Sequence, residues 1–499
     1  MMLQSPLDPI ISAIAWLRAI ASSYLTPAAI GLLPVIILVL FALLALGVGL
    51  HRDPLPFSVL GVVLAAVACL LTDSSSYPLQ CYGRLYIRDV YSDFFIMIVL
   101  VVSVMVLVAS RAHHQYLGCY NFMFLVSFAG AILVVMANDL IAIFVAFELM
   151  ATPTYVLVAL SENRGAIDGA TKYFIMGLLS IALMLLGITL IYAATGETEL
   201  HAVGLAVSGI WSGPIDDRTY SLLVAIVLLI VSFGFKIGIF PGWMWVPDAY
   251  GTADGSVAGY LAGASKKTGI GALVRIFMVF PVVAQLTLLG AVLAVVSVLT
   301  MTIGNVLALA ERRIARMLAY SSIAMMGYLF MGLAAGTASG LAAALYTAFA
   351  HAVTKSAAFI AVWTLGAELS KTVTYDDLSG LARRSPILAA CLSVLVLALA
   401  GMPFTVGFLS KFALFLSAFE AGLLWLVVAG VVNTLYSLGY YLRVVRHCYF
   451  VESTASVQIR VPRTTRLVLI AAVVVVVAAG TVFGPVYDWA VLAASVHYP

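Results

Sequence analysis

The chain has 499 residues, of which 64% are hydrophobic and only 9% are charged. A soluble domain carries roughly 25% charged residues, and its core has no room for this excess of apolar side chains. The net charge of +3 is small, and no basic cluster is interleaved with aromatic residues, so nucleic-acid binding has no support. The composition predicts an integral membrane protein.

The N-terminal stretch from Met1 to Leu25 does not resemble a signal peptide. Arg18 and the Ser22-Ser23 pair interrupt it, and no basic residue precedes its apolar part. A secretory signal peptide begins with a positively charged region ahead of an apolar one. We therefore expect a retained, partly amphipathic segment ahead of the first span.

Hydrophobic runs recur along the rest of the chain. About 20 apolar residues in a helix cross the roughly 30 Å of membrane hydrocarbon. About fourteen spans are expected, at 27–50, 57–72, 89–110, 119–136, 139–160, 170–194, 220–240, 256–280, 285–309, 316–336, 340–366, 386–417, 421–445 and 466–487. No stretch outside them is long enough to fold alone, so the predicted fold class is an all-α integral membrane protein.

Two of these spans are interrupted. The seventh reads GFKIGIFPG from Gly234 to Gly242, and the twelfth reads GMPFTVGFLSK from Gly401 to Lys411. A matched pair of broken helices in the two halves of a transporter indicates an inverted repeat with ion sites at the breaks. Glycine and proline are also common in ordinary membrane helices, but the lysine in each segment favours the repeat.

The predicted organisation has four regions. Residues 1–118 form helices 1–3, residues 119–280 a first repeat of five helices, residues 281–450 a second inverted repeat of five, and residues 451–499 the last helix. Helices 7 and 12 are the discontinuous ones.

Basic residues gather in alternate loops. The loops after odd-numbered spans contain Arg52, Arg111, Arg164, Arg312, Arg313, Arg316, Lys371, Arg383, Arg384, Arg443, Arg446, Arg460, Arg463 and Arg466. The other side has little more than Arg18, Arg84, Arg88, Arg218 and Arg275. By the positive-inside rule the first set faces the cytoplasm, which places both termini outside.

The lysines are distributed differently from the arginines. Only Lys371 lies plainly in a loop, whereas four lysines lie inside apolar spans: Lys236, Lys266, Lys355 and Lys411. Each costs at least about 2.5 kcal/mol at mid-membrane. A buried lysine can gain and lose a proton near neutral pH, which arginine cannot. This pattern predicts that the chain moves protons or sodium ions.

Glu148 in the fifth span supplies a counter-charge. Apolar residues precede it from Leu140 onward, and Pro153 follows five residues later. A carboxylate at this depth is paired or protonated, and its natural partner is a buried lysine. We expect a pair with Lys236. An ion pair that only fixes helix packing is the alternative.

Three further basic residues are weighed separately. His351 precedes Lys355 by four residues on one helix face, which favours a shared proton path over a histidine that is merely hydrogen-bonded in the core. Lys172 follows Asp168 by four residues at the mouth of the sixth span and is expected at the interface. Lys267 points about 100° away from Lys266, so no role is assigned to it.

Together these motifs resemble the antiporter-like subunits of respiratory complex I, most closely subunit N, over residues 85–450. The similar segments are NDL at 138–140 and FEL at 147–149, TKYF at 171–174, the lysine and loop at 235–250, SK at 265–266, RMLAYSSIA at 316–324 and the twelfth-helix motif at 401–412. This resemblance implies that protons are relayed by Glu148, Lys236, Lys266 and Lys411, with Lys172 auxiliary.

The sequence also departs from the family. Trp243 and Met325 stand where histidines are usual, which puts a path bridged by those histidines in doubt. The His351-x-x-x-Lys355 pair instead resembles the paralogous antiporter subunits and the archaeal-type versions of subunit N. The resemblance implies that the relay crosses the second half through this pair.

The resemblance implies one arm of a proton-pumping quinone or phenazine oxidoreductase in the cell membrane, driven by NADH, ferredoxin or a reduced deazaflavin. The implied partners are paralogous antiporter-like subunits and small helical subunits. This chain has no nucleotide, flavin, haem or cluster motif, so iron–sulfur clusters, flavin and quinone are expected on other subunits. A subunit of a multisubunit Na+/H+ antiporter or membrane-bound hydrogenase, and a scaffold with fixed ion pairs, are the alternatives.

Overall fold

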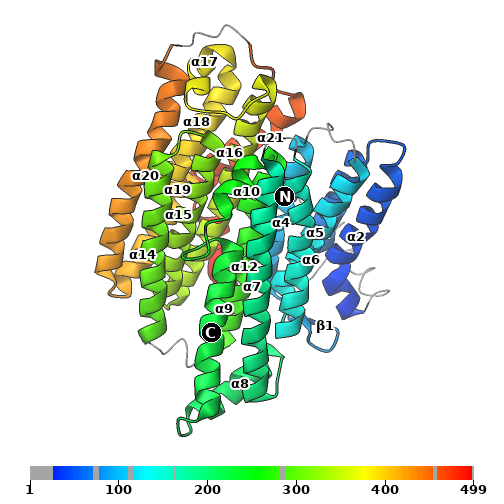
Figure 1. The fold of residues 1–499 in the computed structure, drawn as a ribbon, viewed down its shortest axis with the longest axis vertical. Helices are drawn as coiled ribbons and strands as arrows, with labels where there is room; N and C mark the ends of the chain where they lie inside the picture. The colour runs from blue at the N-terminus through cyan, green and yellow to red at the C-terminus, as the bar shows by residue number, and fades with distance from the viewer. Residues whose placement is uncertain are drawn as a thin grey trace, which may run out of the picture.

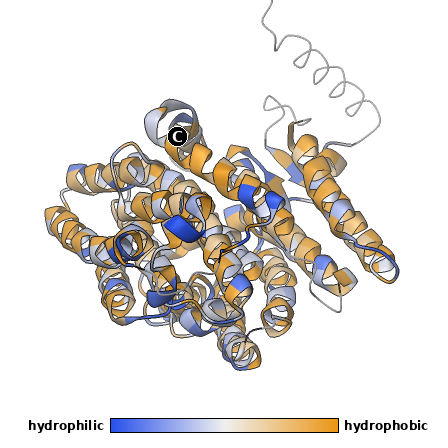
Figure 2. Ribbon diagram, turned by 90° about the horizontal axis from the view of Figure 1, so that it is seen from above, coloured by the Kyte–Doolittle hydropathy of each residue, from blue (hydrophilic) through white to orange (hydrophobic). Residues whose placement is uncertain are grey.

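The computed structural model describes residues 26–70, 78–110, 117–161, 163, 165–279, 287–452 and 458–496. The predicted N-terminal segment, Arg18, Arg111 and Arg164 lie outside the described residues. Long helices run side by side as an upright bundle (Figure 1), and hydrophobic residues cover most of their length (Figure 2). The prediction of a helical membrane protein is confirmed.

The first part of the bundle contains α2 (Pro27–Val48), α3 (Leu55–Leu70), α4 (Val90–Ala109), α5 (Leu117–Met136), α6 (Leu140–Ala159), α7 (Ala166–Thr195), α8 (Leu200–Trp211) and α9 (Asp217–Ile237). The chain continues through α10 (Val246–Thr252), α11 (Gly255–Tyr260), the π-helix η2 (Leu261–Ser265) and α12 (Lys266–Val279).

The second part contains α14 (Thr287–Ala310), α15 (Ile314–Ala334), α16 (Ala338–Leu369), the 3₁₀-helix η3 (Asp376–Leu378), α17 (Leu381–Arg384), α18 (Pro386–Ala400), α19 (Val406–Glu420) and α20 (Leu424–Phe450). It ends with α21 (Arg463–Thr481) and α22 (Gly484–Ser495).

The expected fourteen long spans are not all long single helices. Within the described residues, eleven helices are long and apolar enough to cross a membrane. The span expected at 57–72 is the 16-residue helix α3. The span expected at 256–280 is built from α11, η2 and α12, and the one at 386–417 from α18 and α19. The glycines and prolines of these segments divide them into shorter pieces.

One small sheet interrupts the helical fold. Strand β1 (Leu79–Cys81) pairs antiparallel with β2 (Tyr86–Arg88), with Leu79 opposite Arg88. The all-α prediction does not include this hairpin, whose three-residue strands are too short for a recognisable alternation. Asp89 directly after it caps α4, its carboxylate accepting a hydrogen bond from Ser92 N at 2.7 Å. The hairpin therefore leads directly into a membrane helix.

The basic loops lie together at one end of the bundle. Arg313, before α15, forms a bridge with Thr374 in the loop after α16. Ile459 N donates a hydrogen bond to Arg384 O, and Gly380 N donates to His447 O. The hairpin and α8 lie at the opposite end, below α9 in Figure 1. The arginine-rich loops thus share one face, which we call the arginine-rich face.

The first predicted break lies between α9 and α10. Gly238 has a left-handed φ of 69° and ends α9, and Pro241 follows in the connecting turn. The break frees polar backbone groups, which are costly to leave unpaired in hydrocarbon. Trp245 Nε1 donates to Phe235 O at 2.8 Å, and Phe240 N donates to Thr300 Oγ1 of α14 at 3.2 Å. Neighbouring helices therefore satisfy the break.

The second predicted break lies between α18 and α19. Gly401 ends α18 with a φ of 91°, and α19 resumes at Val406. The last carbonyl of α18, Ala400 O, accepts a hydrogen bond from Lys411 Nζ at 3.0 Å. The lysine that the sequence placed in this segment thus occupies the break itself.

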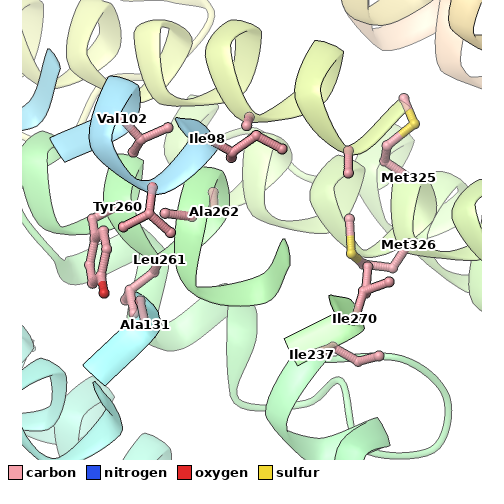
Figure 3. Packing of buried hydrophobic residues seen from close by; sticks show 14 of the residues in the cluster. Ile98, Val102, Ala131, Ile237, Tyr260, Leu261, Ala262, Ile270, Met325 and Met326 are labelled. Carbon is pink, nitrogen blue, oxygen red and sulfur yellow. The ribbon is translucent and has the colours of Figure 1, made fainter. Parts of the chain in front are cut away.

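The 32-residue helix α16 joins the two parts of the bundle. It contacts α4, α11 and η2 on one side and α15, α18 and α19 on the other. The close approach of η2 depends on Gly263, because a Cβ atom there would lie 2.0 Å from Ser356 Oγ of α16. Figure 3 shows apolar side chains around this contact, among them Leu261 and Ala262 of η2 and Val102 of α4.

We expect Gly407→Ala to destabilise the second break. A Cβ atom at Gly407 would lie 1.8 Å from Ala398 O, a backbone atom that cannot move aside. Overpacking of this kind costs about 1–3 kcal/mol. Thermal unfolding of the purified protein in detergent measures the effect. Gly209→Ala in α8, where nothing lies within 4 Å, is the matched control. Equal stability of the two variants would contradict the close packing of α18 and α19.

Candidate functional site

Glu148 of α6 and Lys236 of α9 form the predicted pair. Lys236 Nζ donates to Glu148 Oε1 at 2.8 Å, and Nζ also lies 5.8 Å from the centre of the Phe147 ring. The Lys236 side chain is 6% exposed and that of Glu148 is 24% exposed. On α6, Ile141 and Val145 are exposed as well, so Glu148 lies at the edge of an outward apolar face.

Lys266, the first residue of α12, lies against the first break. Its Nζ is 4.9 Å from the centre of the Tyr250 ring, and a Cβ atom at Gly238 would lie 3.2 Å from it. Gly238 is only two residues after Lys236. The Lys266 side chain is buried, and its Nζ makes no hydrogen bond to any described residue. An amine without a hydrogen bond to a described residue therefore lies against the break that follows Lys236.

Lys267 is also buried, and it faces a different helix. Its Nζ is 2.6 Å from His351 Nδ1 of α16 and donates a hydrogen bond to Ala262 O of η2. No role is assigned to Lys267 from the sequence, because a helix with one inward face leaves one of two neighbouring residues outside. Here η2 and α12 are buried all round, so both lysines point inward in different directions.

Lys355 and Lys411 occupy the second half of the bundle. Lys355 Nζ donates to Ser321 Oγ at 2.6 Å and to Leu318 O at 3.3 Å. Lys411 Nζ, besides its bond to Ala400 O, lies 5.1 Å from the centre of the Tyr328 ring. The groups around these lysines are therefore neutral carbonyls, hydroxyls and aromatic rings, which can stabilise a nearby positive charge.

The two positions where a histidine is usual hold apolar packing instead. Met325 is buried in the core on α15 (Figure 3). The Trp243 ring lies 6.2 Å from that of Tyr320. The histidine that the structure places among the buried lysines is His351.

Lys172 of α7 pairs with an aspartate that is distant in the sequence. Its Nζ is 2.7 Å from Asp248 Oδ2 of α10, not paired with Asp168, and its side chain is 60% exposed. Arg316 Nη2 of α15 is 2.8 Å from the other oxygen, Asp248 Oδ1. Asp248 thus joins α7, α10 and α15. Lys172 and Asp248 are 76 residues apart in the sequence, so this pair depends on the tertiary fold.

Lys371 lies in a loop, as predicted, and pairs with Asp377. Partial burial raises the pKa of the Asp377 carboxyl, but hydrogen bonds from Lys371 and Thr374 lower it by more, so this pKa stays below its usual value. The aspartate is therefore charged at neutral pH, and the pair is an ordinary structural one outside the membrane-spanning helices.

A cavity of about 650 Å³ opens at the arginine-rich face. Its lining includes Tyr250, Asp254, Phe359, Trp363 and Lys371. The Tyr250 hydroxyl is buried and makes no hydrogen bond to a described residue. The same tyrosine ring lies 4.9 Å from Lys266 Nζ, so Tyr250 adjoins both the cavity and the buried amine. No spacing in the sequence predicts this cavity.

The buried groups do not form a metal centre. Within the part of the chain that the structure describes, no three His, Cys, Asp or Glu side chains lie together as metal ligands would. The arrangement can instead hold and transfer protons, because α6, α9, α12, α16 and α19 each contribute at least one carboxylate or basic nitrogen to the interior.

Comparisons with known proteins give a consistent result. Residues 137–437 match the transmembrane family described as NADH:quinone oxidoreductase/Mrp antiporter. F(420)H(2) dehydrogenase subunit N of Methanosarcina mazei is 36% identical over 495 residues, which cover 94% of this chain and 99% of the relative. NADH-quinone oxidoreductase subunit N 2 of Syntrophobacter fumaroxidans is 34% identical, over 88% and 92% of the two chains.

Solved structures share the fold. A chain of respiratory complex I from Thermus thermophilus aligns with a TM-score of 0.77 and 27% identity, covering 91% of this chain and 98% of that one. A chain of the membrane-bound sulfane sulfur reductase, an archaeal respiratory membrane complex, aligns with a TM-score of 0.86 and 23% identity, over 93% and 97%. The resemblance drawn from the sequence motifs is confirmed.

We expect Asp248→Asn to weaken the contact between α7, α10 and α15. The amide cannot accept two charged hydrogen bonds as the carboxylate does, and the loss is about 1–3 kcal/mol. Thermal unfolding in detergent measures it. Asp168→Asn removes an exposed carboxylate and should change stability by less than about 0.5 kcal/mol. If Asp168→Asn proves the more destabilising change, Lys172 pairs locally after all.

Proposed function

We propose that this chain, which belongs to the NADH:quinone oxidoreductase/Mrp antiporter family of membrane proteins, translocates protons within a complex I-like oxidoreductase. The observation that carries the proposal is the succession of buried basic side chains, which begins at the ion pair Glu148–Lys236. Lys266, His351, Lys355 and Lys411 continue it, and Lys172 is auxiliary at the surface.

The chemistry of the buried groups favours protons over sodium ions. Sodium is a hard cation that needs several oxygen ligands, like other hard cations. Lys266, Lys355 and Lys411 present nitrogen atoms that repel a cation when protonated and bind a proton when neutral. Each lysine is surrounded by neutral carbonyl, hydroxyl or aromatic groups, which tolerate both states.

The ion pair acts as the switch in this proposal. With Glu148 close, Lys236 holds its proton. When Glu148 moves away, the desolvated ammonium loses its partner and releases the proton toward Lys266, beside Gly238. Moving one proton against about 150 mV costs on the order of 3.5 kcal/mol. Breaking a buried ion pair costs about 3–5 kcal/mol, so the energies match.

The cavity supplies the entry route. It reaches from the arginine-rich face to Tyr250, and Tyr250 contacts Lys266. A tyrosine hydroxyl can accept and donate a proton, so it can connect water in the cavity with the amine. By the positive-inside rule this face is cytoplasmic, in the cell membrane, and both termini lie outside.

The relay residues divide between two inverted repeats, at 119–280 and 281–450, flanked by regions 1–118 and 451–499. The support is that each repeat has one broken helix with a lysine, Lys236 beside the first break and Lys411 in the second. A repeat of this kind lets one half open to each side of the membrane.

Partner subunits are needed to cover Glu148. A carboxylate that is 24% exposed on an apolar helix face is costly against lipid, so a neighbouring membrane subunit covers it. The paralogous antiporter-like subunits of such complexes are the proposed neighbours. Flavin, iron–sulfur clusters and quinone belong to other subunits, with NADH or reduced F420 as donor.

A cation/proton antiporter subunit is the second candidate, because the matched family also includes Mrp antiporters. Isolating the native complex and identifying its subunits distinguishes the two. Co-purification with iron–sulfur and quinone-site subunits supports the oxidoreductase, whereas a complex without redox subunits overturns it in favour of the antiporter.

We expect Glu148→Gln to reduce proton pumping by at least tenfold. The amide keeps the shape of the side chain but cannot hold or release the Lys236 ammonium. Glu148→Asp keeps the charge and should retain much more activity. Quenching of an acridine dye in sealed membrane vesicles, with equal assembly of the complex verified, measures pumping. A Gln variant that pumps as well as the unmodified protein would mean that Glu148 is structural.

We expect Tyr250→Phe to slow pumping several-fold without loss of stability. The substitution keeps the ring under Lys266 and removes a hydroxyl that bonds to no described residue. Tyr260→Phe is the matched control, because that hydroxyl is buried and bonded to Ser127. It should lower stability by about 1 kcal/mol and leave pumping per assembled complex unchanged. The reverse pattern would exclude entry through Tyr250.

A further inference from the structure

Two consecutive lysines point to different halves of the bundle. Lys266 lies against Tyr250 and Gly238 at the first break, whereas Lys267 lies against His351 of α16. Successive residues of a helix are rotated by about 100°, and α12 is buried on every side at this point. One peptide unit therefore spans the junction between the two halves.

The backbone before Lys267 is built to receive its amine. The residues Leu261–Ser265 form a π-helix, and Ala262 O within it accepts a hydrogen bond from Lys267 Nζ. π-helical turns are rare and occur frequently at functional sites. The second bond of Nζ, 2.6 Å long, joins it to His351 Nδ1. The amine is thus held between a fixed carbonyl and a titratable ring.

We propose that Lys267 is a proton carrier between Lys266 and His351, and so connects the two halves of the relay. The proposal rests on the proposed function above. The Lys267 ammonium transfers a proton from Nζ to His351 Nδ1 and becomes a neutral amine. His351 then releases the proton on Nε2, which bonds to no described residue, toward Lys355 one turn along α16.

The surroundings of Lys267 favour passing a proton on over retaining it. The charged groups that act on it are Lys266 and Lys355, both cationic when protonated. Two neighbouring protonated lysines repel each other in a medium of low dielectric. A proton arriving on Lys266 therefore favours release from Lys267 to the histidine, which moves charge in one direction.

Three substitutions in the intact complex test this role. Lys267→Met keeps the length without a proton site, and Lys267→Arg keeps the hydrogen-bond donors but cannot release a proton. Both should reduce dye-quenching proton uptake in sealed vesicles by at least tenfold, with assembly unchanged. Lys267→His should retain some pumping with its pH optimum moved to the acid side, because an imidazole titrates near pH 6.5.

Control variants separate the possible outcomes. Thr268→Val removes a buried hydroxyl on the next residue and should leave pumping unchanged. If Lys411→Met stops pumping but Lys267→Met or Lys267→Arg does not, the proposal for Lys267 is overturned and the proposed function stands. If Lys267→Met loses pumping but Lys267→Arg pumps normally, the role of Lys267 is structural. If Lys411→Met and Glu148→Gln also pump normally, the proposed function itself fails.

Discussion

The cost of placing a lysine ammonium in hydrocarbon determines most of the unusual features of this fold. Among the buried lysines, and within the described part of the chain, only Lys236 has a carboxylate within hydrogen-bond reach. Elsewhere the backbone supplies the compensation: Ala400 O at the end of α18 for Lys411, and Ala262 O in the π-helix for Lys267. Interrupting a membrane helix frees carbonyls for this purpose, although Lys355 bonds to Leu318 O inside the continuous helix α15. The irregular segments and the buried amines are therefore two aspects of one constraint.

Some of this arrangement could be predicted from the sequence, because it leaves a local chemical signal. Glycine, proline and lysine together marked the breaks at Gly238 and Gly401, and a carboxylate in an apolar span marked Glu148. The π-helix has no such signal, since LAGAS at 261–265 is an ordinary stretch of small residues. The sequence assigns Lys267 no role because helical periodicity assumes one buried face per helix, whereas α12 is buried on every side near Lys267. The partner of Lys172 depended on the tertiary fold.

Membrane complexes named for different reactions contain chains with this fold. Chains of complex I and of the sulfane sulfur reductase share this architecture with TM-scores of 0.77 and 0.86, although their complexes differ in the reactions for which they are named. The membrane scaffold therefore does not specify the electron donor. In this chain His351 lies among the buried lysines, beside Lys267.

In the proposed relay, the scarcity of carboxylates is itself functional. A lysine paired with a buried glutamate is separated from its proton only at a cost of about 3–5 kcal/mol, close to the energy of a whole pumping step. If every lysine had such a partner, each would hold its proton too strongly to pass it on. A single pair at Glu148 and Lys236, followed by amines bonded to neutral groups, places one large barrier where it can be controlled. Beyond it, Lys266, Lys267, Lys355 and Lys411 can pass a proton without breaking another ion pair.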